Sequence, residues 1–412
     1  MKALIVGGGI GGLSTALSLH AAGIECCVLE SVTRLEALGL GINLQPNAVR
    51  ELIELGLGPA LAETAIETST LAYHNKHGQL IWREPRGRAA GYAWPQHSIH
   101  RGDLLMVLLD AVRTRIGPEN IRAGHHLVSF EETAGKVAAH VVDRASGRTL
   151  PPLGADVLIG ADGIHSTVRR QLYPDEADPV PSGAIQWRGA VEAEPYLDGR
   201  THVMIGHYRQ RTVIYPMSRK RSLINWVAYV GGQHTGQERE SWDRRVPKER
   251  FIEFYRGWNF DWIRPEEMIA ATREIYEYPE ADHDPLARWS VGRVTLLGDA
   301  AHAMRPVGSQ AGSQAVVDAR VLARALATEA TPQKALAAYE AARLPVMNEI
   351  IRRNREYGPE IVMQMAEERA PDGFERIEDV IPRHELEEIA RSFKIAAGFD
   401  PEALNRRSSL SV

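Results

Sequence analysis

Cysteine is nearly absent from this sequence. Its 412 residues include two cysteines, Cys26 and Cys27. The two are adjacent, and neighbouring residues on a strand point to opposite faces. They therefore supply neither a disulfide framework nor a cysteine-based metal centre. This usage is typical of a reducing compartment, and we expect a cytoplasmic protein without a metal site.

An excess of charge of one sign is also lacking. Lys and Arg number 48 against 53 Asp and Glu, so the net charge is −5, and it is spread along the chain rather than gathered in blocks. We therefore expect no nucleic-acid or membrane partner, because both need a basic surface. Apolar residues at 44% and charged residues at 25% are globular averages, which exclude disordered, collagen-like and coiled-coil classes.

The sequence has no long hydrophobic run without interruption. Residues 3–24 carry no charge, but glycines and the polar Ser14, Thr15, Ser18 and His20 interrupt them. A membrane span would leave these polar groups in lipid, so we expect neither a span nor an export signal.

The same segment instead predicts a strand at 3–6, a glycine turn, a helix at 13–22 and a second strand at 26–29. Gly7, Gly9 and Gly12 match the G-x-G-x-x-G fingerprint, in which glycines permit a tight turn and the close approach of a pyrophosphate to a helix N-terminus. Glu30 stands where the ribose-binding carboxylate is expected. The alternative is a glycine turn without a ligand, and the fingerprint alone does not separate FAD from NAD(P).

Two later segments repeat the pattern of a strand that ends at an acidic residue. The apolar run 155–159 is followed by Asp162-Gly163 and then by a predicted helix at 167–172. The predicted strand 293–297 is followed by Gly298-Asp299, Pro306, Gly308, Gly312 and a long predicted helix at 313–327. A carboxylate at a strand end can accept hydrogen bonds from sugar or ribitol hydroxyls.

Together these three segments resemble the class A flavoprotein monooxygenases, the family of para-hydroxybenzoate hydroxylase. The resemblance implies an α/β fold: a Rossmann-like FAD-binding domain of the glutathione reductase type, with an inserted antiparallel β-sheet substrate layer and C-terminal helices. Arg101 matches the family's arginine at a helix start, where it contacts the cofactor. The FAD-binding residues that the resemblance implies are Gly7, Gly9, Gly11, Gly12, Glu30, Ser31, Gly41, Ile42, Arg101, Leu127, Asp162, Asp299, Gly308 and Gly312.

The likeness is closer to one branch, the phenazine monooxygenases that act on an N-methylated phenazine carboxylate. It runs through residues 39–49, 82–87, 96–102, 187–189, 225–227 and 284–286. It covers roughly residues 1–355 and leaves the C-terminal end unmatched. Motifs shared with the whole family fix the cofactor well, whereas those of the branch fix the substrate poorly.

The resemblance also implies the reaction. NAD(P)H, a transient co-substrate without a domain of its own, reduces FAD. O2 then adds at the flavin C4a, and the hydroperoxide hydroxylates an aromatic or N-heteroaromatic, carboxylated small molecule, with oxidative decarboxylation when attack falls at the carboxylated carbon. The resemblance places Tyr215, Arg211 and Pro306 at the reacting centre. Tyr215 and Arg211 share one strand face by their spacing, and Arg211 can pair with a substrate carboxylate; the alternatives are a core tyrosine and a solvated arginine.

Other polar and aromatic residues keep two interpretations each. Trp187, Arg188 and Trp226 form either an aromatic wall with a cation or simple core packing. His207 is either a base or a surface residue, and His302 is more readily a hydrogen-bonded structural residue than a catalytic one. Gln310, where relatives place a small residue or Asn, makes either a loop hydrogen bond or a contact with substrate or flavin.

The predicted organisation has four parts: an FAD-binding part at 1–180, the substrate layer at 181–290, a return to the FAD domain at 291–358, and a C-terminal helical segment and tail at 359–412. Strands are expected at 184–194, 202–206, 211–216 and 223–230, with a small sheet near 127–142. A helix is expected at 246–258, and another at 335–357 with a kink or break at Pro345. Residues 370–412 suggest a loosely packed tail.

Three rival functions remain open from the sequence. A flavin halogenase shares the fold, but its W-x-W-x-I-P motif is not matched by the nearest stretch, residues 258–265. A flavin reductase or dehydrogenase would use no O2 productively, and a non-catalytic FAD-binding regulator would bind FAD without oxidising NAD(P)H. The exact ring, the choice between NADH and NADPH, and a monomer or homodimer state stay open.

Overall fold

Residues 1–133, 135–218, 220–232 and 244–412 are described by a computed structural model of the chain, the side chain of residue 279 excepted. The strand–turn–helix–strand unit predicted at the N-terminus is confirmed. Strand β1 (Lys2–Val6) leads into helix α1 (Ile10–Ala21), and strand β2 (Glu25–Glu30) follows. These strands belong to a six-stranded sheet with the order β18-β19-β12-β1-β2-β8. Its remaining members are β8 (Ile121–Ala123), β12 (Val157–Gly160), β18 (Ser290–Val291) and β19 (Val294–Leu296).

Parallel pairing in this sheet brings the three motif segments to one edge. Val6 lies beside Gly160, and Gly160 lies beside Leu296. The glycine turn, the Asp162 segment and the Gly298 segment therefore all leave the sheet at the carboxyl ends of neighbouring strands. That edge is where ligands bind in open α/β sheets.

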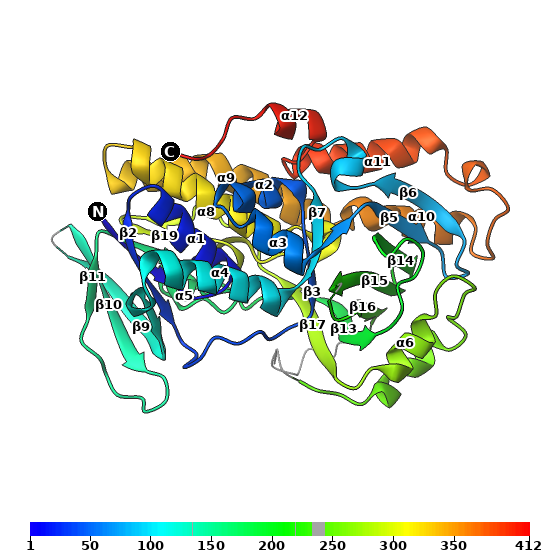
Figure 1. The fold of residues 1–412 in the computed structure, drawn as a ribbon, viewed down its shortest axis with the longest axis horizontal. Helices are drawn as coiled ribbons and strands as arrows, with labels where there is room; N and C mark the ends of the chain where they lie inside the picture. Colours follow the sequence, from blue (N-terminus) through cyan, green and yellow to red (C-terminus); the bar gives the residue numbers. More distant parts are fainter. Residues whose placement is uncertain (134, 219, 233–243) are drawn as a thin grey trace.

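Helices cover the sheet, and a smaller sheet lies beside it. Helix α1 packs between α4 and α8, and Figure 1 shows these helices grouped over the blue N-terminal strands. The helices of this part are α2 (Pro46–Glu54), α3 (Gly58–Thr64), α4 (Arg101–Ile116), α5 (Thr167–Leu172), α7 (Asp299–His302), α8 (Ala311–Thr328) and α9 (Pro332–Arg355). The predicted small sheet is confirmed as three antiparallel strands, β9 (His125–Thr133), β10 (Lys136–Asp143) and β11 (Leu153–Ala155).

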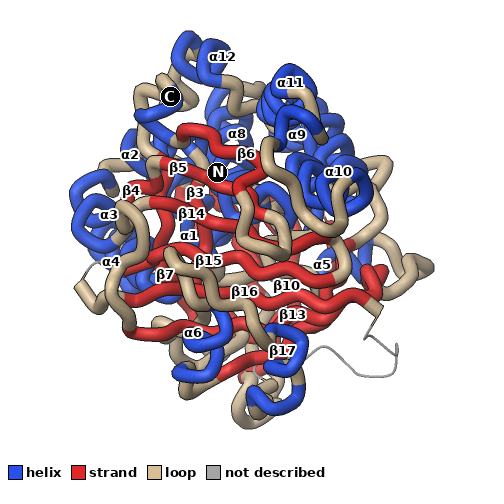
Figure 2. Tube along the Cα trace, turned by 90° about the vertical axis from the view of Figure 1, so that its right-hand side faces the viewer, coloured by secondary structure: helices blue, strands red, loops and turns tan. Residues whose placement is uncertain are grey.

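The four predicted strands of the substrate layer are also confirmed, within a larger sheet than expected. The seven-stranded order is β17-β13-β16-β15-β14-β5-β6, and Figure 2 shows these strands side by side. All pairs are antiparallel except β14 with β5. The strands are β5 (Thr70–His74), β6 (Leu80–Pro85), β13 (Val180–Glu192), β14 (Thr201–His207), β15 (Gln210–Ser218), β16 (Leu223–Gly231) and β17 (Ile275–Asp282). Strands β5 and β6 come from the expected FAD-binding part, so this sheet crosses the proposed boundary at residue 180. A separate three-stranded sheet joins β3 (Gly41–Leu44), β7 (Gln96–His100) and β4 (Ile66–Thr68).

The helix expected at 246–258 is wrong. This segment instead forms two short 3₁₀ turns, Lys248–Arg250 and Ile252–Tyr255. Phe251 separates them with the non-helical backbone angles φ −143° and ψ −12°, and its buried ring stacks on Trp187 with centroids 4.5 Å apart. The burial of this aromatic ring against the sheet outweighs the local preference for a continuous helix. The short helix α6 (Pro265–Ala271) follows.

The loosely packed tail expected at 370–412 is also wrong. Helices α10 (Ile361–Arg369), α11 (Arg383–Ala396) and α12 (Pro401–Arg406) close over the molecule. Phe393 and Phe399 are buried in the main core, and the Tyr92 hydroxyl donates a hydrogen bond to the Phe399 carbonyl at 2.6 Å. Widely spaced apolar residues thus anchor a segment that we had expected to be loosely packed. Helix α9 continues through Pro345, so no break occurs there.

No helix in the described ranges is both long and apolar enough to cross a membrane.

Candidate active site

A cavity of about 690 Å³ lies between the carboxyl edge of the six-stranded sheet and one face of the seven-stranded sheet. Its volume is within the range of roughly 300–1,000 Å³ that is usual for small-molecule and cofactor sites. The structure brings most of the site residues expected from the sequence to its wall. These are Gly7, Gly9, Gly11, Glu30, Ser31, Gly41, Ile42, Arg101, Leu127, Asp162, Tyr215, Asp299, Pro306 and Gly312. Gly12, Arg211 and Gly308 lie behind this surface, at positions described below.

The glycine turn needs its glycines for steric reasons. Gly7 has φ +107°, and a Cβ there would lie 2.3 Å from the Ala161 carbonyl oxygen. A Cβ on Gly12 would lie 1.9 Å from the Gly7 carbonyl oxygen, so Gly12 lets helix α1 pack against the turn. A Cβ on Gly9 would meet no protein atom within 4 Å. The space in front of Gly9, at the N-terminus of α1, is therefore open to an anion.

Glu30 closes the far side of this turn. Its carboxylate accepts hydrogen bonds from the backbone N–H of Gly8 at 2.7 Å and of Val32 at 2.8 Å. The Ser31 hydroxyl donates to the same carboxylate at 3.2 Å. These bonds fix a carboxylate at the end of β2 beside the glycine turn, the place that a ribose hydroxyl occupies in dinucleotide-binding folds.

The Asp162 carboxylate is hydrogen-bonded to the residues that follow it in the chain. Its carboxylate accepts hydrogen bonds from the Ser166 hydroxyl and from the backbone N–H groups of Thr167 and Val168. Burial raises the pKa of Asp162, although these hydrogen bonds oppose the shift. The residue therefore shapes the β12–α5 loop at the cavity wall, and its carboxylate is already engaged before any ligand contact.

Asp299 and Arg101 differ from Asp162, because their side chains are not engaged by hydrogen bonds within the described protein. Within the described ranges, no protein group makes a hydrogen bond to the side chain of either residue, although both line the cavity. Desolvation by the surrounding protein raises the pKa of Asp299, and the nearby His302 and Arg101 oppose this shift. It also lowers the pKa of Arg101, with a further contribution from the nearby Arg188. Two charged groups of opposite sign thus face the cavity with their hydrogen-bonding capacity unused, which is typical of a site that holds a polar ligand.

The loop between α7 and α8 forms another wall. Gln310 donates a hydrogen bond to the Gly308 carbonyl at 3.0 Å and accepts one from Gln314 at 3.0 Å, so the loop hydrogen bond expected as one of its roles is present. Gly308 has φ +67°, and a Cβ there would lie 2.6 Å from the Phe393 ring. Gly308 therefore faces helix α11 and not the cavity.

The seven-stranded sheet supplies the opposite wall in rows of paired residues. Strand pairing sets Met204 beside Val213, Val213 beside Val227, and Val227 beside Arg188. The first three form an apolar floor. Tyr215 belongs to the row on one side, and the pair Arg211–Tyr229 to the row on the other. Because four residues of strand span about 13 Å, the two flanking rows bracket a space wide enough for a flat ring system.

Tyr215 is a neutral hydrogen-bond donor in this setting. Burial raises the pKa of Tyr215 to about 12, and the neighbouring Arg188 opposes the shift. Its hydroxyl is therefore protonated near neutral pH. It can orient a polar substituent of a bound ring, whereas it is poorly suited to removing a proton.

Arg211 shares the face of Tyr215, as the spacing predicts, but its guanidinium is already occupied. It lies over the Tyr229 ring at 4.1 Å, its Nε is 3.5 Å from a carboxylate oxygen of Glu360, and its Nη1 donates to the Tyr208 carbonyl at 3.4 Å. An arginine that already faces a buried carboxylate is less available for a substrate carboxylate.

Arg188 is the cation that the sequence interpretation undervalued. It lines the cavity, donates to the Gly41 carbonyl at 2.9 Å, and has a buried Nε without a hydrogen-bond partner. No ion pair with an acidic residue is present for it in the described part of the chain. Arg188 and Tyr215 lie on the same cavity-facing side of the sheet. Because Arg188 stands next to Trp187 in the sequence, the sequence analysis grouped it with Trp187 and Trp226 in an aromatic wall.

The remaining candidates take structural roles. Trp187 and Trp226 are buried on the other face of the sheet, and their indole N–H groups donate to Glu277 and Thr272. Packing is thus the correct interpretation for both. His302 is fully buried and bonds Asp318 at 2.6 Å, as expected of a structural histidine. His207 lies outside the cavity wall.

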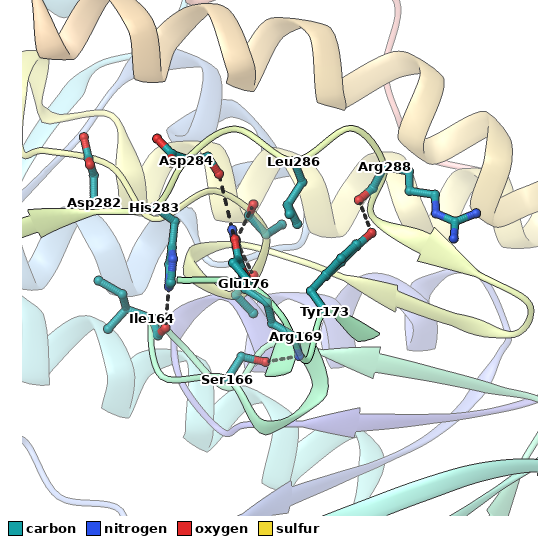
Figure 3. Close-up of polar contacts among 12 residues, drawn as sticks. Ile164, Ser166, Arg169, Tyr173, Glu176, Asp282, His283, Asp284, Leu286 and Arg288 are labelled. Carbon is teal, nitrogen blue, oxygen red and sulfur yellow. Dashed lines mark hydrogen bonds and ion pairs between the residues drawn. The ribbon is translucent and has the colours of Figure 1, made fainter. Parts of the chain in front are cut away.

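Arg169 links the segment after strand β12 to helix α7, and the sequence analysis did not single it out. Figure 3 shows its buried side chain beside the Asp284 segment. It donates to the carbonyls of Ala300 and Ala301 at 3.0 Å and forms an ion pair with Glu176 at 2.5 Å. Figure 3 also shows His283, whose Nε2 bonds the Ile164 carbonyl at 2.9 Å. The β12–α5 loop and helix α7 are therefore held in fixed relation, which sets the separation of Asp162 and Asp299.

We expect Arg169→Met to destabilise the fold and loosen this edge. Removing one partner of a buried ion pair costs about 3–5 kcal/mol, and the carbonyls of Ala300 and Ala301 lose their donor. Thermal unfolding should shift to lower temperature, measured against Arg170→Met, which changes an exposed neighbour on the same helix. Equal melting temperatures for the two variants would rule out this role.

Comparison with known proteins indicates which ligand binds at the carboxyl edge of the six-stranded sheet. The sequence family described as FAD binding domain matches residues 1–354. The chain belongs to this FAD-binding family. It is 43% identical over 361 residues to phenazine 1,6-dicarboxylic acid hydroxylase of Lysobacter antibioticus, covering 86% of this chain and 89% of that protein. It is 34% identical over 391 residues to 3-amino-4-hydroxybenzoate 2-monooxygenase of Streptomyces platensis, covering 91% of this chain and 93% of that one.

The fold comparison agrees. The structure of HpxO from Klebsiella pneumoniae, complexed with FAD and uric acid, superposes with a TM-score of 0.76 at 24% identity, covering 98% of this chain and 96% of that chain. This likeness shows a shared fold. The family match and the two sequence relatives identify the chain as an FAD-dependent monooxygenase.

The residues present fit FAD. The open space at Gly9 lies at a helix N-terminus, which suits a pyrophosphate. Asp299 and Arg101 face the same cavity with unused hydrogen-bonding capacity, and Glu30 stands at the end of β2. The cavity then continues to the sheet floor, which leaves room for a second, smaller molecule beside the cofactor.

Proposed function

We propose that this enzyme uses NAD(P)H and O2, with FAD in its cavity, to hydroxylate a flat aromatic or N-heteroaromatic carboxylate. Where attack falls on the carbon that carries the carboxylate, the same chemistry releases CO2. The observation that carries the proposal is Arg188, a cation on the cavity wall beside an apolar floor. The similar hydroxylases act on a phenazine dicarboxylic acid and an aminohydroxybenzoate, which are acids of this class.

In this proposal the cofactor lies along the carboxyl edge. The N-terminal turn of α1 faces the pyrophosphate and Glu30 the ribose, while Asp299 contacts the ribitol and Arg101 the flavin end. The residues proposed to contact FAD are Gly7, Gly9, Gly11, Glu30, Ser31, Gly41, Ile42, Leu127, Arg101, Asp162, Asp299 and Gly312, whereas Pro306, also on the cavity wall, is proposed to lie at the reacting centre. Gly12 and Gly308 act from behind the wall, because they shape the turn and the loop.

The substrate lies on the sheet floor. Arg188 pairs with its carboxylate, and the neutral Tyr215 hydroxyl donates a hydrogen bond to a ring substituent. When bound, FAD would supply the chemistry that activates oxygen, with NAD(P)H as the reductant. Met204, Val213 and Val227 keep this part of the cavity poor in water, which limits the loss of oxidising equivalents as hydrogen peroxide.

The Arg188→Met variant tests the carboxylate contact. Hydrogen bonds to charged groups are worth about 1.5–3 kcal/mol, so KM for an aromatic carboxylate should rise roughly 10- to 100-fold. KM for the corresponding carboxamide should change little. Exposed Arg273 provides the matched control, because Arg273→Met should leave both values unchanged. Equal losses with the carboxylate and the carboxamide would make Arg188 a structural residue.

The remaining features of the proposal concern organisation. We keep an FAD-binding part at 1–180 and 291–358, a substrate layer at 181–290 and a C-terminal part at 359–412, with β5 and β6 added to the substrate layer. Cytoplasmic residence is supported by the two cysteines, which are both unpaired and buried. A monomer or a homodimer stays a prediction that light scattering can test.

A further inference from the structure

The C-terminal segment places a carboxyl group in the substrate end of the cavity. Glu360 lines the cavity wall and is 7% exposed. It lies beyond the match to the FAD-binding family, which ends at residue 354. This part of the wall therefore comes from the C-terminal segment, beyond the residues that the family model matches.

Unusual backbone geometry brings Glu360 to this position. Helix α9 ends at Arg355, and Tyr357 then adopts φ +70°, a left-handed conformation that is costly for a bulky residue. The Tyr357 ring is held against Tyr208 at 3.7 Å in an edge arrangement. Gly358 fits against Val307 and Phe393, where a Cβ would lie 3.1 Å and 3.0 Å from their side chains. Strain of this kind persists only where the surroundings enforce it, and it concentrates at functional sites.

The two oxygens of Glu360 retain acceptor capacity. Oε1 accepts a long hydrogen bond from the Gly308 N–H at 3.3 Å, and Oε2 lies 3.5 Å from Arg211 Nε. The latter contact is not a hydrogen bond, because Arg211 Nε has no hydrogen-bond partner. A carboxylate offers about four lone-pair sites, so these two contacts leave Glu360 able to accept a further bond from the cavity side.

The charges at Glu360 disfavour a negatively charged ligand group at this end of the cavity. Burial raises the pKa of Glu360, Arg211 and the Gly308 N–H oppose the shift, and Glu280 adds to it. Arg211 supplies a fixed positive charge behind it and is held by the Tyr229 ring and the Tyr208 carbonyl. Arg211 favours the ionised form of Glu360, and in that form the carboxylate accepts a hydrogen bond from a donor on the cavity side.

Arg188 lies at the β13 end of the floor row, next to Val227, whereas Glu360 lies over the neighbouring row of the sheet. Arg188 reaches toward Gly41, which lies against Tyr215, since a Cβ on Gly41 would be 2.6 Å from the Tyr215 ring. Glu360 instead lies over the row of Arg211 and Tyr229. A ring whose carboxylate meets Arg188 thus directs its far side at Glu360.

We propose that Glu360 determines substrate specificity by accepting a hydrogen bond from a hydroxyl, amino or ring N–H group on the side of the substrate away from its carboxylate, with Arg211 as the positioning residue for Glu360. The inference rests on the proposed function for the orientation of the carboxylate. It narrows the substrate class to aromatic carboxylates that carry a hydrogen-bond donor. It also gives Arg211, which is buried behind the cavity wall, the role of holding Glu360 in place.

Ligand binding to the FAD-loaded enzyme tests the proposal by calorimetry, without turnover. The probes are two matched pairs, para-hydroxybenzoate with para-methoxybenzoate, and a hydroxyphenazine carboxylate with its methyl ether. In the unmodified enzyme the donor-bearing member of at least one pair should bind about tenfold or more tightly. In Glu360→Gln the amide oxygen turns toward Arg211 and presents its NH2 group to the cavity, so this preference should be lost or reversed.

Two further variants separate a specific role from a structural one. Glu368→Gln removes a charge from the exposed side of α10 and should keep the full preference. Glu360→Asp keeps the charge on a shorter side chain and should reduce the preference without reversing it. Absence of any donor preference in both pairs, or equal weakening of both members of a pair in Glu360→Gln, would overturn the proposal. Failure to form a hydroxylated product would contradict the proposed function but would leave these binding ratios interpretable.

Discussion

Asp299→Ala should be purified largely without FAD. The side chain faces the cavity beside Arg101 and has no hydrogen-bond partner among the described protein groups, so its capacity is reserved for the cofactor. Alanine removes this contact and a negative charge that acts on Arg101. The loss of one hydrogen bond to a charged group costs about 1.5–3 kcal/mol, which corresponds to roughly 10- to 100-fold weaker binding of FAD.

The flavin absorbance of purified protein, divided by its protein absorbance, measures this loss. Asp379→Ala provides the control, because Asp379 is an exposed carboxylate in the C-terminal segment. It should retain the FAD content of the unmodified enzyme. Stoichiometric FAD in Asp299→Ala would remove Asp299 from the cofactor site.

Gly12→Ala should have the largest effect on the fold itself. The added methyl group would lie 1.9 Å from the Gly7 carbonyl oxygen, and the obstacle is backbone rather than a flexible side chain. Helix α1 must then move away from the turn and from α8, against which it packs. Overpacking typically costs about 1–3 kcal/mol, and occasionally more, so we expect both a lower melting temperature and loss of FAD.

Gly9→Ala separates these two effects. A methyl group there meets no protein atom within 4 Å, so the FAD-free protein should melt as the unmodified FAD-free protein does. The methyl group occupies the space assigned to the pyrophosphate, and FAD binding should therefore weaken. Gly154→Ala, also without a neighbour within 4 Å but far along the chain on β11, should change neither property. Equal melting temperatures for Gly12→Ala and Gly9→Ala would contradict the packing role of Gly12.

The cofactor edge could be predicted because its signals are local. Gly7, Gly9 and Glu30 stand at fixed spacing within one strand–helix–strand unit, and the strands before Asp162 and Asp299 are short apolar runs that end at acidic residues. Parallel strands of one sheet bring such ends together whatever lies between them in the chain. The sequence therefore predicted which residues share this edge, although not that the Asp162 carboxylate would be engaged by its own loop.

The substrate end was harder to predict because its residues meet through long-range packing. Glu360 reaches Arg211 across a distance of many residues in the chain, and no local pattern near residue 360 indicates that it turns inward. Arg188 looked like part of an aromatic wall because alternation on β13 cannot tell which face of a strand meets a cavity and which meets a core. The close packing of the C-terminal segment was missed for a related reason. Their anchors, Phe393 and Phe399, gain stability only from burial against distant elements.

Labelled oxygen shows whether the enzyme transfers an oxygen atom from O2 to an aromatic carboxylate. Purified FAD-loaded enzyme is given NADH or NADPH, isotopically heavy O2 and a panel of aromatic and phenazine carboxylates, and product masses are recorded. The account predicts that at least one acid accelerates NAD(P)H oxidation and gains a single heavy oxygen atom. Accelerated oxidation that yields only hydrogen peroxide, or NAD(P)H oxidation that proceeds equally well when another acceptor replaces O2, would contradict it.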